Sequence, residues 1–227
     1  MPKRKVPLIN NEIYHIINKG LASQPIFTTK KDYKRALNTI FYYQNQHLPF
    51  KYSHFVVQPK KEKEEIIKKL KSKKDPLVEI IAYCLMPNHF HFLLKQKVDN
   101  GISKLLANFT NSYAHYFNSK KGRKNYLFQG RFRAIRIETE EQLLHVSRYI
   151  HLNPYSSNIV KNLKDLQNYP YSSLPQYLKK ADSKFCQCQK EIISNYFKNK
   201  NQYQKFVFDQ ADHQRKLDKI KHLLLED

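Results

Sequence analysis

Two apolar runs separated by a short turn constrain the fold of this chain more than any other feature. Residues 77–85 and 90–95 are rich in branched and aromatic side chains, and Met86-Pro-Asn-His89 lies between them. Proline and asparagine between two apolar runs indicate a turn, so the sequence predicts an antiparallel β-hairpin. We therefore expect a sheet that contains at least one antiparallel pair.

The segments around the hairpin alternate between strand and helix patterns. Further strands or extended segments are expected over 12–18, 52–57 and 132–138. Helices are expected over 32–46, 103–118 and 140–152. Thr28 or Thr29 could cap the first helix, and Pro154 is expected to end the last one. This order predicts an α+β fold, with a central, mainly antiparallel sheet and helices packed on a face of it.

The charge balance favours a polyanionic partner. Lysine and arginine total 41 against 19 aspartate and glutamate, which gives a formal net charge of +22. Such an excess attracts nucleic acid, although charge alone would also suit an anionic membrane surface. No apolar run approaches membrane-spanning length, so we expect a nucleic-acid partner and no membrane association. Neither of the Gly-rich phosphate-loop motifs occurs.

Cysteine usage and the N-terminus indicate the compartment. The three cysteines form no even disulfide framework, and the pair Cys186 and Cys188 lacks the second thiol pair of a zinc knuckle. No apolar stretch follows the basic start of the chain, so a signal peptide is not expected. We therefore expect a cytoplasmic protein.

His89 and His91 are candidate metal ligands. On a strand the side-chain period of two puts both imidazoles on one face and turns Phe90 to the other. Two neutral imidazoles at such positions can chelate one divalent cation. Two half-buried strand histidines without a ligand would fit the same pattern.

Tyr149 and Asn153 are candidates for a nucleophile and a neutral oxygen ligand. They are four residues apart on an expected helix, so they lie on the same face, one turn from each other. The alternative is a tyrosine that packs with Val146 and Ile150 and an asparagine that ends the helix before Pro154.

Taken together, these motifs closely resemble the single-tyrosine HUH transposases, the IS200-like transposases, and in particular the REP-associated tyrosine transposases. The resemblance is carried mainly by three motifs, Tyr83–Leu94, Phe128–Phe132 and Arg148–Pro154. Weaker shared pieces are Tyr14–Gly20 and Tyr169–Ser173, so the resemblance spans roughly residues 12–178. It implies the HUH nuclease type of α+β fold, which is ferredoxin-like.

The resemblance also implies a role for each matching residue. His89 and His91 match the paired metal ligands, Tyr149 matches the nucleophile, and Asn153 matches the position that carries a third, amide-type ligand. A divalent metal, Mg²⁺ or Mn²⁺, and a single-stranded or hairpin DNA substrate are therefore expected. The implied reaction is metal-dependent cleavage of single-stranded DNA through a 5′-phosphotyrosyl intermediate, followed by strand transfer.

Basic side chains near these motifs are candidates for DNA contact. They are Lys95, Arg131, Arg133, Arg136 and Arg148. Lysine and arginine near an active site can bind phosphates, but each could equally be a solubilising surface charge.

The domain organisation follows from where the resemblance stops. Residues 1–178 are expected to form the transposase domain, and the Lys-rich stretch at about 59–76 looks inserted, as a short exposed helix or a flexible segment. Residues 179–227 are expected to form a helical extension, with helices over about 186–196 and 202–225.

Three other functions remain open from the sequence. One is a non-catalytic DNA-binding relative of the family, and another is an endonuclease of the replication-initiator type. A metallo-hydrolase that cuts with water would leave no bond between protein and DNA. Monomer and homodimer are both compatible with the sequence.

Overall fold

A four-stranded antiparallel sheet forms the centre of the protein. The computed structural model describes residues 7–72, 75–178 and 188–216. The strands are β1 (Ile13–Lys19), β2 (Val78–Met86), β3 (His89–Gln96) and β4 (Arg133–Ile137), in the spatial order β2-β3-β1-β4. Every neighbouring pair is antiparallel, and Met86 pairs with His89 across the turn. The predicted hairpin and the predicted α+β class are therefore confirmed.

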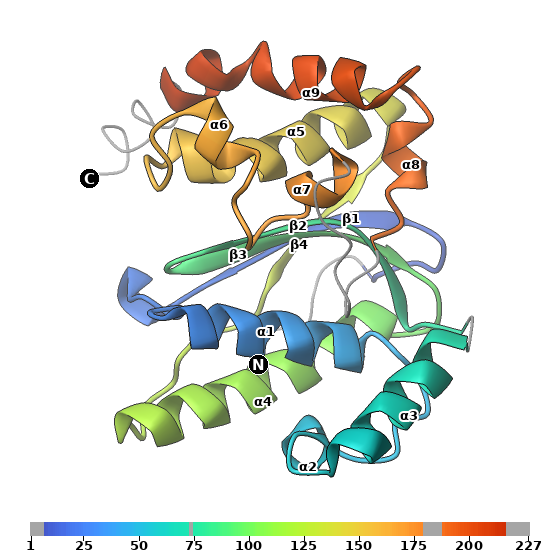
Figure 1. Ribbon diagram of the computed structural model, residues 1–227, viewed down its shortest axis with the longest axis vertical. Coiled ribbons are helices and arrows are strands. Elements are labelled where there is room, and N and C mark those ends of the chain that lie inside the picture. The colour runs from blue at the N-terminus through green and yellow to red at the C-terminus, as the bar shows by residue number, and fades with distance from the viewer. Residues whose placement is uncertain (1–6, 73–74, 179–187, 217–227) are drawn as a thin grey trace.

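The pleat divides the sheet into two faces that are covered by different helices (Figure 1). Helices α1 (Lys30–Tyr43) and α4 (Gly101–Lys121) cover the face that carries Tyr14, Ile16, Phe90, Phe92 and Leu94. Helix α5 (Glu140–Ser156) covers the opposite face, where Leu93 and Ile137 pack against Ile150 and Leu152. The sequence predicted helices packed on a face of the sheet, and the structure has helices on both faces.

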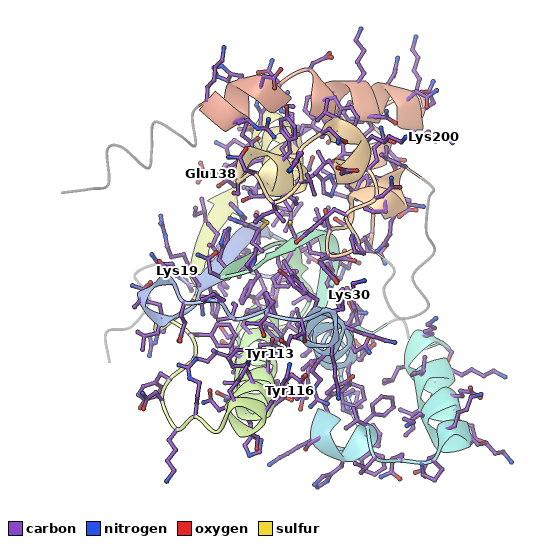
Figure 2. The ribbon with its side chains drawn as sticks, turned by 60° about the vertical axis from the view of Figure 1, so that its left-hand side comes forward. Lys19, Lys30, Tyr113, Tyr116, Glu138 and Lys200 are labelled. Atoms are coloured by element: carbon purple, nitrogen blue, oxygen red, sulfur yellow. The ribbon has the colours of Figure 1, made fainter. Side chains whose placement is uncertain are left out.

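Capping and tyrosine hydrogen bonds join α1 to α4. The Thr29 hydroxyl accepts from the Asp32 amide, and the Asp32 carboxylate accepts from the Thr29 amide, so Thr29 is the predicted cap. Tyr116 of α4 donates its hydroxyl to Asp32, and Tyr113 donates to the Ile26 carbonyl at 2.6 Å. Figure 2 shows these two tyrosines on the side of α4 that faces α1. Hydrogen bonds therefore hold α4 against α1 and the segment before it, in addition to apolar packing.

The segment predicted as extended over 52–57 is helical instead. Helix α2 covers Tyr52–Phe55, and a three-residue spacing puts the two end residues on one side, where both are buried. Their rings pack against Tyr42, and the Tyr43 hydroxyl accepts a hydrogen bond from the Tyr52 amide at 2.9 Å. Aromatic enrichment favours a strand locally, but packing against α1 decides the conformation.

The Lys-rich stretch forms a helix. Helix α3 (Lys60–Ser72) has no fully buried residue, but Ile66, Ile67 and Leu70 lie partly buried against the core. The helical alternative is therefore the one that the structure contains.

Helix α5 continues beyond its predicted end. It runs to Ser156 with Pro154 inside it, although a proline and the residue before it both disfavour the helical conformation. Leu152, Tyr155 and Ser156 are buried in this last turn. Burial of the last turn outweighs the local preference, so the prediction that Pro154 ends the helix is wrong.

Four short helices complete the α5 side. They are α6 (Leu163–Leu166), α7 (Leu174–Tyr177), α8 (Glu191–Ser194) and α9 (Lys200–Phe208). His151 of α5 lies between Tyr203 Oη and Ser173 Oγ, at 2.7 Å from each. Helix α8 is shorter than the helix predicted over 186–196, and residues 179–187 and 217–227 lie outside the described part of the chain.

The motif Tyr169–Ser173 covers the outer edge of β2. The Leu85 amide donates to the Tyr171 carbonyl at 2.9 Å, and the Ser173 amide donates to the Tyr83 carbonyl at 3.0 Å. The Tyr169 hydroxyl adds a bond to the Leu85 carbonyl at 2.9 Å. The motif thus pairs the polar groups of an edge strand that would otherwise be open to other chains.

The structure also bears on the predictions about membrane association and about the cysteines. Among the described residues, no helix combines the length and the apolar character that crossing a membrane requires. Cys84 and Cys188 are buried and form no disulfide with any described residue, and Cys186 of the Cys-x-Cys pair lies outside the described residues.

Candidate active site between the sheet and helix α5

Two histidines of β3 lie on the face of the sheet that α5 covers. His89 begins the strand directly after the turn, and His91 follows two residues later. Their ring centroids are 4.9 Å apart, and His91 is only 3% exposed. The structure thus places both imidazoles on one face, as the period of two predicts, with Phe90 buried in the opposite core.

Hydrogen bonds at Nδ1 orient both imidazoles. His89 Nδ1 lies 2.7 Å from the Asn88 side-chain oxygen, which can only accept, so Nδ1 donates and Nε2 has the lone pair. His91 Nδ1 lies 3.0 Å from His15 Nε2, and either nitrogen can be the donor; when His91 Nδ1 donates, His91 Nε2 has the lone pair for a ligand bond. Partners of this kind orient metal-binding histidines in proteins.

His15 is a third histidine at this site, and the sequence analysis gave it no role. It lies on β1, and its ring stacks on His91 with centroids 5.2 Å apart. Antiparallel pairing puts Ile17 opposite His91 and His15 opposite Leu93, so the two histidines are diagonal neighbours. The sequence did show that His15 lies in the strand predicted over 12–18. Its partner His91, however, is 76 residues away, so local spacing could not bring the two together.

Tyr149 reaches this histidine cluster from α5. Its ring meets His91 edge-on with centroids 5.5 Å apart, and it lies 6.0 Å from the ring of His15. Asn153, one turn later, is 3% exposed and donates its side-chain amide to the Tyr149 carbonyl at 3.2 Å. Because the amide nitrogen is used as the donor, the amide oxygen is the atom suited to bind a metal.

Burial keeps His91 and His15 neutral. It holds the pKa of His91 well below the ordinary 6.5, with smaller contributions from His89 and His15. Burial, followed by the charge of Arg133, lowers the pKa of His15 to about 4. A neutral imidazole has the lone pair that a metal bond requires.

The side chains in the site fit a divalent cation in their chemistry. Two imidazole nitrogens and one amide oxygen are ligands that Mn²⁺ accepts, while Mg²⁺ prefers oxygen. Within residues 7–72, 75–178 and 188–216, no three His, Cys, Asp or Glu side chains are grouped to hold a metal. A site here would therefore need Asn153 and an oxygen from the substrate.

The five basic candidates lie in different surroundings. Arg133 pairs with Ile17 on β1, and its charge acts on His15. Arg131 is exposed in the loop before β4. Lys95 is on the histidine face, but six residues at about 3.3 Å per residue put it about 20 Å from His89.

The other two basic residues have contacts outside the cluster of His15, His89 and His91. Arg136 is on the opposite face of β4 and is ion-paired with Glu12 at 2.8 Å. Arg148 lies over the ring of Phe206 at 4.5 Å and bonds to His145 Nδ1 at 2.9 Å. Contact between any of the five and DNA stays a prediction.

A cavity of about 820 Å³ lies outside this site. It is bounded by α1, α3 and the beginning of β2, with Phe41, Tyr42, Ile67 and Val78 among its lining residues. The site around Tyr149 is instead formed where β1, β3 and α5 meet.

Comparison with known proteins supports both the fold and the resemblance. The protein family described as "Transposase IS200 like" matches residues 46–153, which include His89, His91, Tyr149 and Asn153. The solved structure of a REP-associated tyrosine transposase bound to a REP hairpin has the same fold, with a TM-score of 0.51. It is 15% identical in sequence, and the match covers 82% of this chain and 98% of that one. No curated protein matches the chain. The predicted resemblance and fold are confirmed.

Proposed function

We propose that this chain, whose residues 46–153 match the IS200-like transposase family, cleaves and rejoins single-stranded DNA through Tyr149. The observation that supports the proposal most is the position of Tyr149, whose ring lies 5.5 Å from that of His91 and 6.0 Å from that of His15. A purely DNA-binding protein would not need this set of side chains together.

The proposed reaction exchanges one phosphate ester for another. The Tyr149 hydroxyl attacks a backbone phosphorus, a bond forms from its oxygen to the 5′-phosphate, and the bond to the 3′-oxygen breaks. The proton lost by the phenol ends on the released 3′-hydroxyl. Attack by another 3′-hydroxyl reverses the step and joins strands without an external energy source.

His89, His91 and Asn153 are the residues that would hold a Mg²⁺ or Mn²⁺ ion. A bound divalent cation would supply positive charge beside the scissile phosphate. The protein's own contribution is to orient each imidazole through a partner at Nδ1, Asn88 for His89 and His15 for His91. Asn153 and Tyr149 both lie on α5, so the helix would fix the distance between the nucleophile and the third proposed ligand.

Single-stranded or hairpin DNA is the substrate that we propose. The formal net charge of +22 attracts a polyanion, and the similar solved protein is bound to a REP hairpin. Arg133 is the basic candidate that lies beside the histidines, so it is the first of the five expected to contact a phosphate near the scissile bond.

A denaturing gel of protein with end-labelled DNA hairpins and Mn²⁺ tests this proposal. We expect an adduct that survives detergent in the wild type and is lost in Tyr149→Phe. Tyr155→Phe is the matched control, because it makes the same change on the same helix. Its hydroxyl is bonded to Asp212 at 2.8 Å and lies outside the histidine cluster.

Each other outcome favours a named alternative. Cleavage without an adduct would indicate a metallo-hydrolase, and binding without cleavage would indicate a non-catalytic relative. An adduct that persists in Tyr149→Phe would show that another residue is the nucleophile.

A further inference from the structure

The loop between α4 and β4 is basic and carries one highly exposed aromatic side chain. The segment from 100 to 137 contains no acidic residue, whereas Lys121, Arg123 and Lys124 follow one another closely at the end of α4. Lys120 is used in an ion pair with Asp32, but Lys121 and Lys124 are exposed. This loop therefore presents uncompensated positive charge.

Tyr126 is the exposed aromatic residue. It is 86% exposed, the largest exposed fraction among the large hydrophobic side chains of the described residues. A single exposed hydrophobic side chain needs no explanation by itself. Its fixed backbone and its basic neighbours indicate a role for Tyr126.

The backbone on both sides of Tyr126 is held in place. Asn118 donates its side-chain amide to the Asn125 carbonyl at 2.8 Å. Leu127 is 1% exposed, and its carbonyl accepts from the Leu21 amide at 3.0 Å and from the Gln24 side chain at 3.2 Å. The phenol ring is thus exposed on a backbone that is fixed before and after it, which lowers the entropy lost on binding.

This loop joins the sheet at the end where His89 lies. Phe128 forms a bridge with Gly20, and the Gln129 amide donates to the Lys19 carbonyl at 2.8 Å. The Gly20 amide in turn donates to the Asn88 carbonyl at 2.8 Å, next to His89. Two strand spacings, about 10 Å, therefore separate the start of β3 from Phe128. Figure 2 shows Lys19 at the rim of the molecule at this end of β1.

We propose that Tyr126 stacks on an unpaired base of the DNA strand that enters the active site, while Lys121 and Lys124 contact its phosphates. The inference rests on the proposed function and adds a base-binding position to it. Stacking on an aromatic ring tolerates any base, so this position would hold the strand without reading its sequence. Tyr126 is a positioning residue, since it does not touch the reacting atoms.

The test compares one hairpin with and without a single-stranded flank, in the Tyr149→Phe background so that no chemistry intervenes. Tyr126→Ala is expected to weaken binding of the flanked hairpin roughly 10- to 100-fold. Binding of the hairpin that lacks the flank is expected to stay unchanged. Tyr126→Phe keeps the ring and should restore the affinity for the flanked hairpin.

A fluorescent base supplies an independent readout. We expect 2-aminopurine at one position of the flank to be quenched by stacking on Tyr126, and to lose that quenching in Tyr126→Ala. The matched control is Tyr196→Ala, a second exposed tyrosine at 44% that lies beyond α8. This control should leave both the affinity and the fluorescence unchanged.

Three results would overturn the inference. Unchanged affinity and quenching in Tyr126→Ala would show that the ring does not stack on the flank. An equal loss on both hairpins would assign Tyr126 to the duplex instead. Quenching that survives in Tyr126→Ala would assign the stacking to another residue. If the wild type forms the covalent adduct while Tyr126→Ala binds normally, this inference alone fails and the proposed function stands.

Discussion

The two faces of the sheet are built on different principles. The face toward α1 and α4 is filled by aromatic and aliphatic side chains such as Phe90, Phe92 and Phe109, and all three are fully buried. The face toward α5 buries His15, His91 and Asn153 among its apolar residues. The first face is expected to contribute mainly stability, whereas the second holds the residues for which we propose a role in the reaction. Substitutions on the two faces should therefore separate stability from activity.

The largest expected effect is on activity and comes from the α5 face. His91→Ala should reduce the rate of adduct formation at least about 1000-fold, because it removes one of the proposed ligand nitrogens. Chelating the metal from the wild type should have a similar effect. Time courses on denaturing gels would measure both, with urea unfolding as the check that the variant folds. Near wild-type rates would remove His91 from the active site.

On the opposite face the same truncation should affect stability instead. Phe92→Ala should lower the free energy of unfolding by about 3–5 kcal/mol, since the ring is 1% exposed and leaves a cavity. Urea denaturation at constant pH would measure the change. The rate per folded molecule should stay close to that of the wild type. A large loss of rate in fully folded Phe92→Ala would contradict the division between the faces.

Acid should weaken the fold through the α5 face. Burial lowers the pKa of His151 to about 3, and that of His15 lies at about 4, against 6.5 when unfolded. Between pH 6.5 and 4 the unfolded chain binds protons that the folded chain does not. The free energy of unfolding should therefore be fully retained above pH 6.5. Below that pH it should fall by about 1.4 kcal/mol per pH unit for each histidine.

Urea midpoints of the metal-free protein at pH 7 and pH 5 would measure this loss. His15→Gln should show a shallower decline than the wild type, because one of the buried histidines with a lowered pKa is gone. Identical pH profiles for the two proteins would exclude His15 as a contributor.

His15 should also affect the proposed metal site without being one of its ligands. His15→Ala should weaken metal affinity by about 10- to 100-fold, as losses of orienting partners do. His15→Gln can still bond to His91 Nδ1 and should recover part of that affinity. Titration of Mn²⁺ against the rate of adduct formation would measure both. A metal affinity unchanged in His15→Ala would show that the contact between the two imidazoles has no orienting role.

The smallest effect separates two arginines of one strand. Arg133→Ala should weaken DNA binding a few-fold and lower the salt slope by about one, as expected for one lost phosphate contact. Arg136→Ala should have less effect, because Arg136 lies on the opposite face and is paired with Glu12. Anisotropy titrations at several salt concentrations would compare them, and an equal effect of both would contradict the assignment by face.

Features that depend on residues close together in the chain could be predicted from the sequence. The hairpin follows from a proline and an asparagine between two apolar runs, and the common face of His89 and His91 follows from the period of two. Tyr149 and Asn153 share a helix face because of their spacing. These features depend on neighbours within a few residues, which a sequence shows directly.

The features that were missed depend on contacts between distant segments. Residues 52–55 are helical because they pack on Tyr42 and Tyr43, and α5 passes Pro154 because its last turn is buried. His15 joins the site only through strand pairing with a segment 76 residues later. Roles for the metal ligands and the basic residues come from the resemblance, so they stay predictions that the variants above can test.

The hydrogen bonds of His151 have a consequence for how this protein is made. The imidazole links α5 to Tyr203 of α9, and Ile193, Tyr203 and Val207 share a core with Ile150. During synthesis the ribosome releases the chain from its N-terminus. The helix that carries Tyr149 therefore emerges long before the residues that enclose it. Until about residue 207 has left the ribosome, the α5 side of the nascent protein is unfinished, and the two sides of one sheet mature at different times.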